Sequence, residues 1–240
     1  MKRFYAKNPI PGMELTLAPA EAHHMRDVMR IADGDHVALF NGTGSEYEAV
    51  VVRCRESDEV VCRVLAQIDR TAELPAQVTV YQAVIKGERF DYAVQKCVET
   101  GASAIVPYTA SRSVRRPSNP VKFQQRAQRI ASEAARQCGR SVIPEVAECA
   151  SFDQMVKRAA LAPLLVAYEG EQRRGLRDVL AQGCMPEVGI AIGPEGGFTE
   201  QEMDALTEIG GEMISLGPRI LRSESAGPYI LAQIAYACGQ

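Results

Sequence analysis

Two short turns near the end of the chain carry the residues best suited to chemistry. One is the stretch 193–197, with the sequence GPEGG, and the other is the stretch 217–222, GPRILR. Each follows an apolar stretch of strand type, and Glu169-Gly170 ends a third such stretch. Glycine lets backbone amides approach a ligand closely, and α/β sheets bind ligands at the carboxyl ends of their strands. We expect one ligand site there, although a plain tight turn would use the same residues.

The stretch 193–197 does not match the patterns of the common nucleotide sites. It lacks the spacing G-x-G-x-x-G of dinucleotide-binding loops and the Lys-Ser/Thr pair of a phosphate-binding loop. Thr199 and Glu202 have the spacing of a helix capping box, so we expect a helix to begin directly after the turn. Because the dinucleotide-binding pattern is missing from this stretch, a nucleotide-dependent oxidoreductase is disfavoured.

The cysteines and histidines do not predict a metal site. The seven cysteines are scattered without a C-x-x-C pair, and none of the three histidines is spaced to complete a zinc site. We expect reduced thiols and no metal. The chain also lacks a signal peptide and any run of about 18 apolar residues, which favours a cytoplasmic protein.

Positive charge is concentrated in one segment although the whole chain carries a formal charge of -3. The segment 112–140 contains eight arginines and lysines against one acidic residue, Glu133, a local charge of +7. Such local density suits contacts with RNA phosphates, but a solvated helix face would have the same composition.

The elements that must position these residues follow from periodicity. Alternation over 36–40, 47–54 and 60–68, with a turn at Ser57-Asp58, predicts a small β-barrel. After a linker at 71–77, strands alternate with helices: strands over 78–84, 104–108, 164–168, 188–192 and 213–216, and helices around 90–98, 123–138 and from about 224. This alternation predicts an α/β domain with a mainly parallel sheet. We expect domains at 1–72 and 73–240.

The final segment resembles the knotted methyltransferases of the SPOUT superfamily, whose pattern is close to LG-x-R-I-L-R-x-E-T-A. The matching residues are Leu216, Gly217, Arg219, Ile220, Leu221, Arg222, Glu224 and Ala226, with Ser225 where threonine is usual. The blocks 3–5, 23–30, 86–115 and 133–140 resemble one family, the ribosomal small subunit methyltransferase E family. Departures at Met25, Met29, Thr100 and Ala127 fall at packing positions.

The resemblance implies an N-terminal PUA-like RNA-binding barrel and a trefoil-knotted α/β methyltransferase domain in a homodimer. Periodicity cannot show a knot, which is a rare exception among folds. The resemblance further implies that S-adenosylmethionine is the cofactor and that N3 of a uracil in 16S rRNA is methylated, with the assembled small ribosomal subunit as partner. A SPOUT enzyme acting on another RNA nucleotide, or an inactive RNA-binding assembly factor, remains an alternative.

The resemblance also implies which residues form the site. The cofactor would be held by Leu165, Glu169, Gly193, Glu195, Gly196, Gly197, Leu216, Gly217, Ile220 and Leu221. Arg222 is the candidate for stabilising the developing uracil anion, because a guanidinium stays charged; a salt bridge with Glu224 is the structural alternative. Glu195 or Glu224 is a candidate general base, with water or phosphate as the alternative. The expected RNA contacts are Arg3, Arg26, Arg30, Arg112, Arg115, Arg116 and Arg140.

Overall fold

Two stretches that are distant in the sequence combine into the first compact unit, residues 1–73 with 135–143. The second unit comprises 74–134 and 144–240. The computed structural model describes residues 1–54, 59–69, 72–181 and 183–240. The predicted turn at Ser57-Asp58 and the first residue of the predicted linker, Thr71, lie outside the described residues. The grouping of 135–143 with the first unit did not follow from the periodicity, because residues 135–138 continue the helical pattern that begins in the second unit.

Alternating apolar residues build the five-stranded sheet of the first unit. Its strand order is β1-β3-β4-β5-β2; β1 pairs in parallel with β3, and the remaining neighbours are antiparallel. The elements are β1 (Lys2–Tyr5), β2 (Glu14–Thr16), α1 (Pro19–His23), the π-helical turn η1 (His24–Val28), β3 (His36–Phe40), β4 (Glu46–Arg53) and β5 (Val61–Ile68). The three longer strands confirm the predicted ones, whereas β1 and β2 are too short to show a period.

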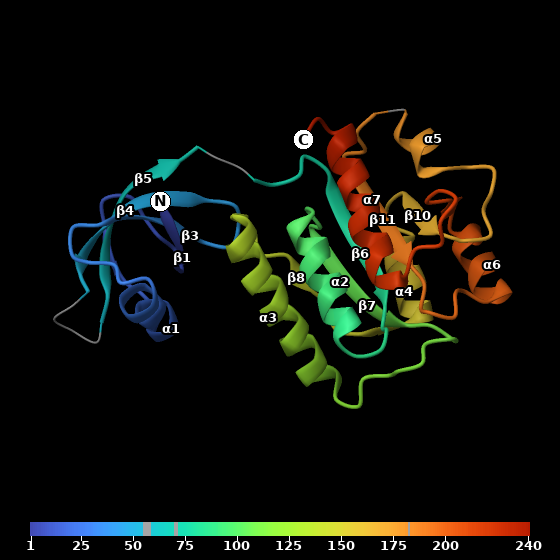
Figure 1. The fold of residues 1–240 in the computed structure, drawn as a ribbon, viewed down its shortest axis with the longest axis horizontal. Coiled ribbons are helices and arrows are strands. Elements are labelled where there is room, and N and C mark those ends of the chain that lie inside the picture. The colour runs from blue at the N-terminus through green and yellow to red at the C-terminus, as the bar shows by residue number, and fades with distance from the viewer. Residues whose placement is uncertain (55–58, 70–71, 182) are drawn as a thin grey trace. The chain divides into compact units, whose positions relative to one another are not determined.

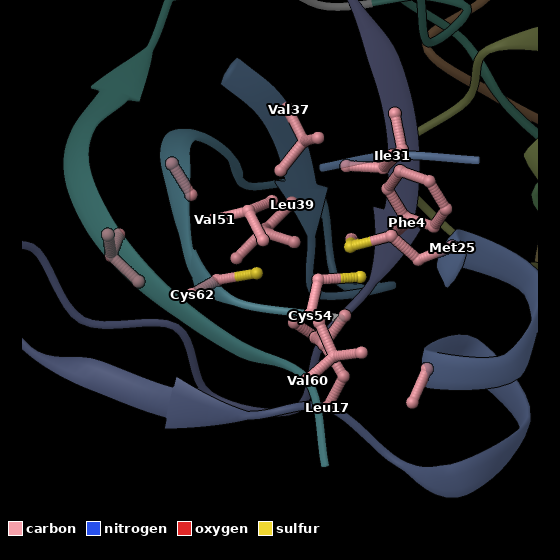
Figure 2. Packing of buried hydrophobic residues seen from close by; sticks show 14 residues of the cluster. Phe4, Leu17, Met25, Ile31, Val37, Leu39, Val51, Cys54, Val60 and Cys62 are labelled. Atoms are coloured by element: carbon pink, nitrogen blue, oxygen red, sulfur yellow. The ribbon is translucent and has the colours of Figure 1, made fainter. Parts of the chain in front are cut away.

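One face of this sheet forms the core of the unit. Figure 2 shows Phe4, Met25 and Leu39 turned toward a common centre, and each is buried. Cys62 lies in the same cluster, and burial raises the pKa of its thiol to about 12, with Cys54 adding to the effect. A thiol with such a pKa stays protonated at neutral pH and behaves as an apolar core group.

The second unit is built on a seven-stranded sheet with the order β12-β10-β11-β6-β7-β8, to which β9 adds beside β7. Every pairing between these strands is parallel, which confirms the predicted parallel α/β arrangement. The strands are β6 (Gln77–Ala83), β7 (Ala104–Thr109), β8 (Glu145–Val146), β9 (Ala150–Ser151), β10 (Leu164–Ala167), β11 (Glu187–Ile192) and β12 (Glu212–Ile214). The helices are α2 (Glu88–Glu99), α3 (Pro120–Cys138), α4 (Phe152–Ala159), α5 (Leu176–Leu180), α6 (Glu200–Glu208) and α7 (Ser223–Ala237). Periodicity did not predict β8, β9, α4 or α5.

Helices cover both faces of this sheet, as the uninterrupted apolar strands require. Met155 of α4 and Leu206 of α6 pack with Tyr81 of β6 in one buried cluster. On the opposite face, α2 and α7 lie side by side (Figure 1), and Gly227 of α7 lies close to Cys97 of α2.

A disulfide joins Cys184, before β11, to Cys238, at the end of α7. The prediction that all seven cysteines are reduced is therefore wrong for this pair. The two residues are 54 positions apart in the sequence, but the fold brings their Cα atoms within 4.7 Å, a separation that a disulfide can span.

Two general properties bear on the site. Within the described ranges, no helix is long and apolar enough to cross a membrane. Among the same residues, no group of three or more His, Cys, Asp and Glu side chains is placed to hold a metal ion.

Candidate functional site at the carboxyl ends of the strands

Three neighbouring strands of the second unit end level with one another beneath a cavity. Ala167 of β10 is the register partner of both Ile192 of β11 and Ile214 of β12. The turns that follow these strands, together with the first turn of α7, line a cavity of about 890 Å³. The strand order thus brings together three segments that the sequence separates.

Most of the predicted cofactor residues line this cavity. Those that do are Glu169, Gly193, Glu195, Gly197, Leu216, Gly217, Ile220 and Leu221. Leu165 does not, because it lies two residues before the end of β10 and is only 2% exposed in the sheet core. Gly196 does not line the cavity either. An added Cβ there would lie 3.1 Å from Cβ of Arg112, so this glycine packs against Arg112.

Three local features fix the conformation of the turn after β11. The Gly197 N–H donates to the Pro194 carbonyl over 3.0 Å, and Gly197 has a φ of 67°, which favours glycine. A Cβ at Gly197 would lie 2.8 Å from Oε1 of Glu169 on the neighbouring turn. The predicted capping box of Thr199 and Glu202 is confirmed, so α6 begins directly after the turn.

A partly buried chain of hydrogen bonds connects this turn to α7. The Ser223 hydroxyl donates to the Gly193 carbonyl over 2.6 Å, and the Gln82 side-chain amide donates to the Ser223 hydroxyl over 3.0 Å. Gln82 is 1% exposed, near the end of β6. Neither residue was predicted from the sequence; a glutamine near the end of a mostly apolar strand was the available signal.

The turn after β10 is organised by Glu171, another cavity residue that the sequence analysis missed. Its carboxylate accepts hydrogen bonds from the backbone N–H groups of Arg173, over 2.6 Å, and Arg174, over 3.1 Å. These bonds favour the charged form and lower the pKa of Glu171.

The three catalytic candidates all line the cavity. Arg222 is exposed and precedes α7 as its N-cap residue. Glu224 is 9% exposed, with Oε1 3.8 Å from Nε of Arg89 and Oε2 buried without a hydrogen-bond partner among the described residues. Among the described residues, Glu224 forms its ion pair with Arg89. The alternative role of Arg222, a salt bridge with Glu224, is therefore not observed there. Glu195 accepts a hydrogen bond from the Lys86 backbone N–H over 3.0 Å.

Comparisons with known proteins agree with this geometry. A family model described as an RNA methyltransferase domain matches residues 72–235, and one described as an RNA methyltransferase PUA domain matches residues 17–65. The ribosomal RNA small subunit methyltransferase E of Bacillus subtilis is 35% identical over 224 residues, which cover 90% of this chain and 87% of that protein. The chain belongs to the ribosomal RNA small subunit methyltransferase E family.

Solved structures show the same relationship. The methyltransferase E of Neisseria gonorrhoeae, bound to S-adenosyl methionine, superposes with a TM-score of 0.89 at 28% identity and covers 97% of this chain and 96% of that one. A methyltransferase from Legionella pneumophila in complex with the cofactor SAM has a TM-score of 0.87 at 31% identity, with 98% of this chain and 97% of that chain covered. The predicted α/β methyltransferase with a PUA-like domain is thereby confirmed at the level of the family.

The structure contradicts two of the RNA contacts predicted for this methyltransferase E family member. In the first unit, Nε of Arg3 lies 2.9 Å from Oε1 of Glu46, and its side chain is 15% exposed. Arg140 is 4% exposed, and its NH2 lies 2.7 Å from Oε2 of Glu73. Both guanidinium groups are occupied by carboxylates inside the unit and do not offer charge to a phosphate.

The other predicted cations are placed differently. Arg112 donates to the carbonyls of Gly196, over 3.0 Å, and Phe198, over 3.2 Å, so it supports the turn after β11. Arg30, Arg115 and Arg116 are exposed. Arg26 is half-buried and bonded to Asp27, whose pKa this contact lowers.

Proposed function

We propose that this methyltransferase transfers the methyl group of S-adenosylmethionine to N3 of a uracil in 16S rRNA. The observation that carries the proposal is the cavity itself: three backbone-rich turns and the start of α7 converge on one space at the sheet edge. The relatives from Neisseria and Legionella, which are similar over nearly the whole chain, are described with this cofactor bound.

The residues of the cavity fit the cofactor. Its volume of about 890 Å³ is in the range of sites for small molecules. The missing side chain at Gly197 lets the Glu169 carboxylate lie directly beside the backbone of the turn. Gly193, Gly197, Leu216 and Gly217 would hold it mainly through backbone groups, while Glu169 supplies a carboxylate.

When bound, the cofactor supplies an electrophilic methyl group whose bond to sulfur breaks, with its electron pair remaining on sulfur, as the uracil N3 bond to carbon forms. The difficulty lies at N3, which is a poor nucleophile while it holds its proton. Arg222 would stabilise the negative charge that develops on the uracil. Glu195 or Glu224 would accept the N3 proton.

We further propose that RNA phosphates contact Arg30, Arg115 and Arg116, with Arg26 contributing from its pair with Asp27 and Arg112 through the turn it supports. The domains would be 1–72, a PUA-like barrel, and 73–240, with a trefoil knot at its end. Homodimer formation through α7 is supported by its exposed Tyr229 and Tyr236. We place the enzyme in the cytoplasm and its substrate in the assembled small subunit.

Nucleoside mass spectrometry of ribosomal RNA from a deletion strain tests the proposal. We expect 3-methyluridine to disappear, to return with the wild-type gene and to stay absent with Arg222→Ala. Arg177→Ala, which alters an exposed arginine of α5, is the matched control and should restore the modification. Unchanged 3-methyluridine in the deletion strain would refute the assigned substrate.

Calorimetry separates an active enzyme from an assembly factor that has lost turnover. The proposal requires the purified wild-type protein to bind S-adenosylmethionine. The absence of binding would favour the inactive assembly factor.

A further inference from the structure

A second depression, of about 490 Å³, adjoins the cofactor cavity. Its lining residues are Lys86, Gly87, Glu88, Arg89, Val114 and Glu195. Arg89 and Glu195 also line the first cavity, so the two spaces share these side chains as a common wall. Whatever occupies the depression lies directly beside the larger cavity.

The sheet explains why the two spaces are neighbours. β6 follows β11 in the strand order, and Gln82 of β6 is the register partner of Ile192 of β11. β6 therefore ends level with the strands beneath the first cavity, and the segment that leaves it, from Val84 to Arg89, passes beside the turn after β11. The hydrogen bond from the Lys86 backbone to Glu195 joins the two segments.

The position suits a methyl acceptor. Transfer between two bound groups requires the reacting atoms to be within about 3–3.5 Å in an aligned arrangement. An acceptor site must therefore open onto the donor site, and the shared Arg89 and Glu195 meet this requirement.

The polar groups of the depression match the edge of a uracil. That edge presents a carbonyl oxygen, the N3–H donor and a second carbonyl oxygen. Its complement is a donor, an acceptor and a donor. Lys86 and Arg89 are donors only, and the carboxylate oxygens of Glu195 are acceptors. The remaining lining side chains include Val114, which is 74% exposed and offers an apolar surface to a ring.

The charge balance also favours a base over a phosphate. Lys86 and Arg89 are opposed by Glu88 and Glu195, so the lining residues carry no net formal charge. A phosphate would meet two carboxylates there, whereas a neutral base needs this mixture of donors and acceptors.

Arg89 is available for such a contact. Its side chain is 49% exposed, and its nearest carboxylate, Glu224, lies at 3.8 Å, which is a loose ion pair. Glu224 is itself buried, whereas about half of the Arg89 side chain stays exposed. Glu224 would therefore orient the guanidinium toward the boundary of the two spaces.

We propose that this depression binds the acceptor uracil, with Lys86 and Arg89 donating to its two carbonyl oxygens and Glu195 accepting from N3–H. The assignment rests on the proposed function and deepens it. It selects Glu195 over Glu224 as the group that receives the N3 proton. Because the cations also favour the deprotonated base, they lower the apparent pKa of N3 in the bound state.

The pH dependence of methyl transfer to small ribosomal subunits that lack the modification tests the proposal. In Lys86→Met and Arg89→Met, loss of a cation raises the apparent pKa of N3. We expect kcat at neutral pH to fall about tenfold or more, and its rising limb to move about one pH unit upward, so that activity recovers in alkali. The dissociation constant for S-adenosylmethionine, measured by calorimetry, should stay within about twofold of the wild-type value.

Lys157→Met is the matched control, because Lys157 is an exposed lysine of α4 in the same unit. Circular dichroism checks that each variant is folded, and Lys86→Met alters only an exposed side chain. An unchanged pH limb in folded Lys86→Met and Arg89→Met, or a loss confined to cofactor affinity, overturns the acceptor site. A wild-type protein that binds no cofactor or transfers no methyl group overturns the proposed function instead.

Discussion

Ser223 connects the proposed cofactor cavity to the interior of the second unit. Its hydroxyl accepts from Gln82 and donates to the Gly193 carbonyl, so one side chain links β6, the turn after β11 and the first residue of α7. A partly buried carbonyl that loses its hydrogen-bond donor loses part of the free energy of that bond. The position of the turn should therefore depend on this hydroxyl.

Ser223→Ala should weaken cofactor binding, because Gly193 and Gln82 each lose a partner. We expect a loss of about 1–2 kcal/mol, or roughly a five- to thirtyfold increase in the dissociation constant for S-adenosylmethionine. Calorimetry measures this change. Ser223→Thr keeps a hydroxyl and should recover most of the affinity; equal losses in both variants would show that the hydrogen bond is not the cause.

At the scale of elements, α7 and α2 approach one another at a glycine. A Cβ added at Gly227 would lie 2.9 Å from Sγ of Cys97, which is 1% exposed. Burial raises the pKa of the Cys97 thiol to about 12, so the sulfur acts as a neutral packing group. The contact sets how closely the two helices pack on the same face of the sheet.

Gly227→Ala should lower the free energy of unfolding despite the higher helix propensity of alanine. Overpacking lowers the free energy of unfolding by about 1–3 kcal/mol, whereas the higher helix propensity of alanine raises it by at most about 1 kcal/mol. In a Cys97→Ala background the same substitution should become neutral or stabilising, because the opposing sulfur is gone. Urea denaturation of the four proteins in this double-mutant cycle gives the coupling, and additive effects would contradict the contact.

At the scale of the whole molecule, one covalent link joins distant parts of the chain. The disulfide between Cys184 and Cys238 closes a stretch with a sequence separation of 54, which includes β11, α6, β12 and α7. Of the three turns that line the 890 Å³ cavity, only the one after β10 lies outside this stretch. Closing a loop of this length restricts the unfolded chain by up to about 4 kcal/mol.

Reduction should therefore lower the melting temperature by several degrees, since 1 kcal/mol corresponds to about 2–4 °C in a chain of this size. Differential scanning calorimetry with and without dithiothreitol measures the shift. Cys238→Ser should melt at one temperature in both conditions. A wild-type protein that is insensitive to the reductant would show that the two thiols are not linked.

Local patterns sufficed for much of this protein. Apolar periodicity predicted the longer strands and helices, the Thr199–Glu202 spacing predicted the start of α6, and glycine-containing turns after strands predicted where a ligand cavity forms. These features depend on neighbours within a few residues, so the physical preferences of a short segment determine them.

Only the tertiary structure decided which of the candidate side chains are available. Arg3 and Arg140 are of a residue type that binds RNA phosphates. The fold nevertheless places each beside a carboxylate from a distant segment. Leu165 is a predicted cofactor residue but lies in the sheet core. Because β6 lies beside β11, Lys86 lines the second depression and Gln82 supports the cavity residue Ser223 through a hydrogen bond. Burial and pairing depend on residues far apart in the chain, and no local pattern carries that information.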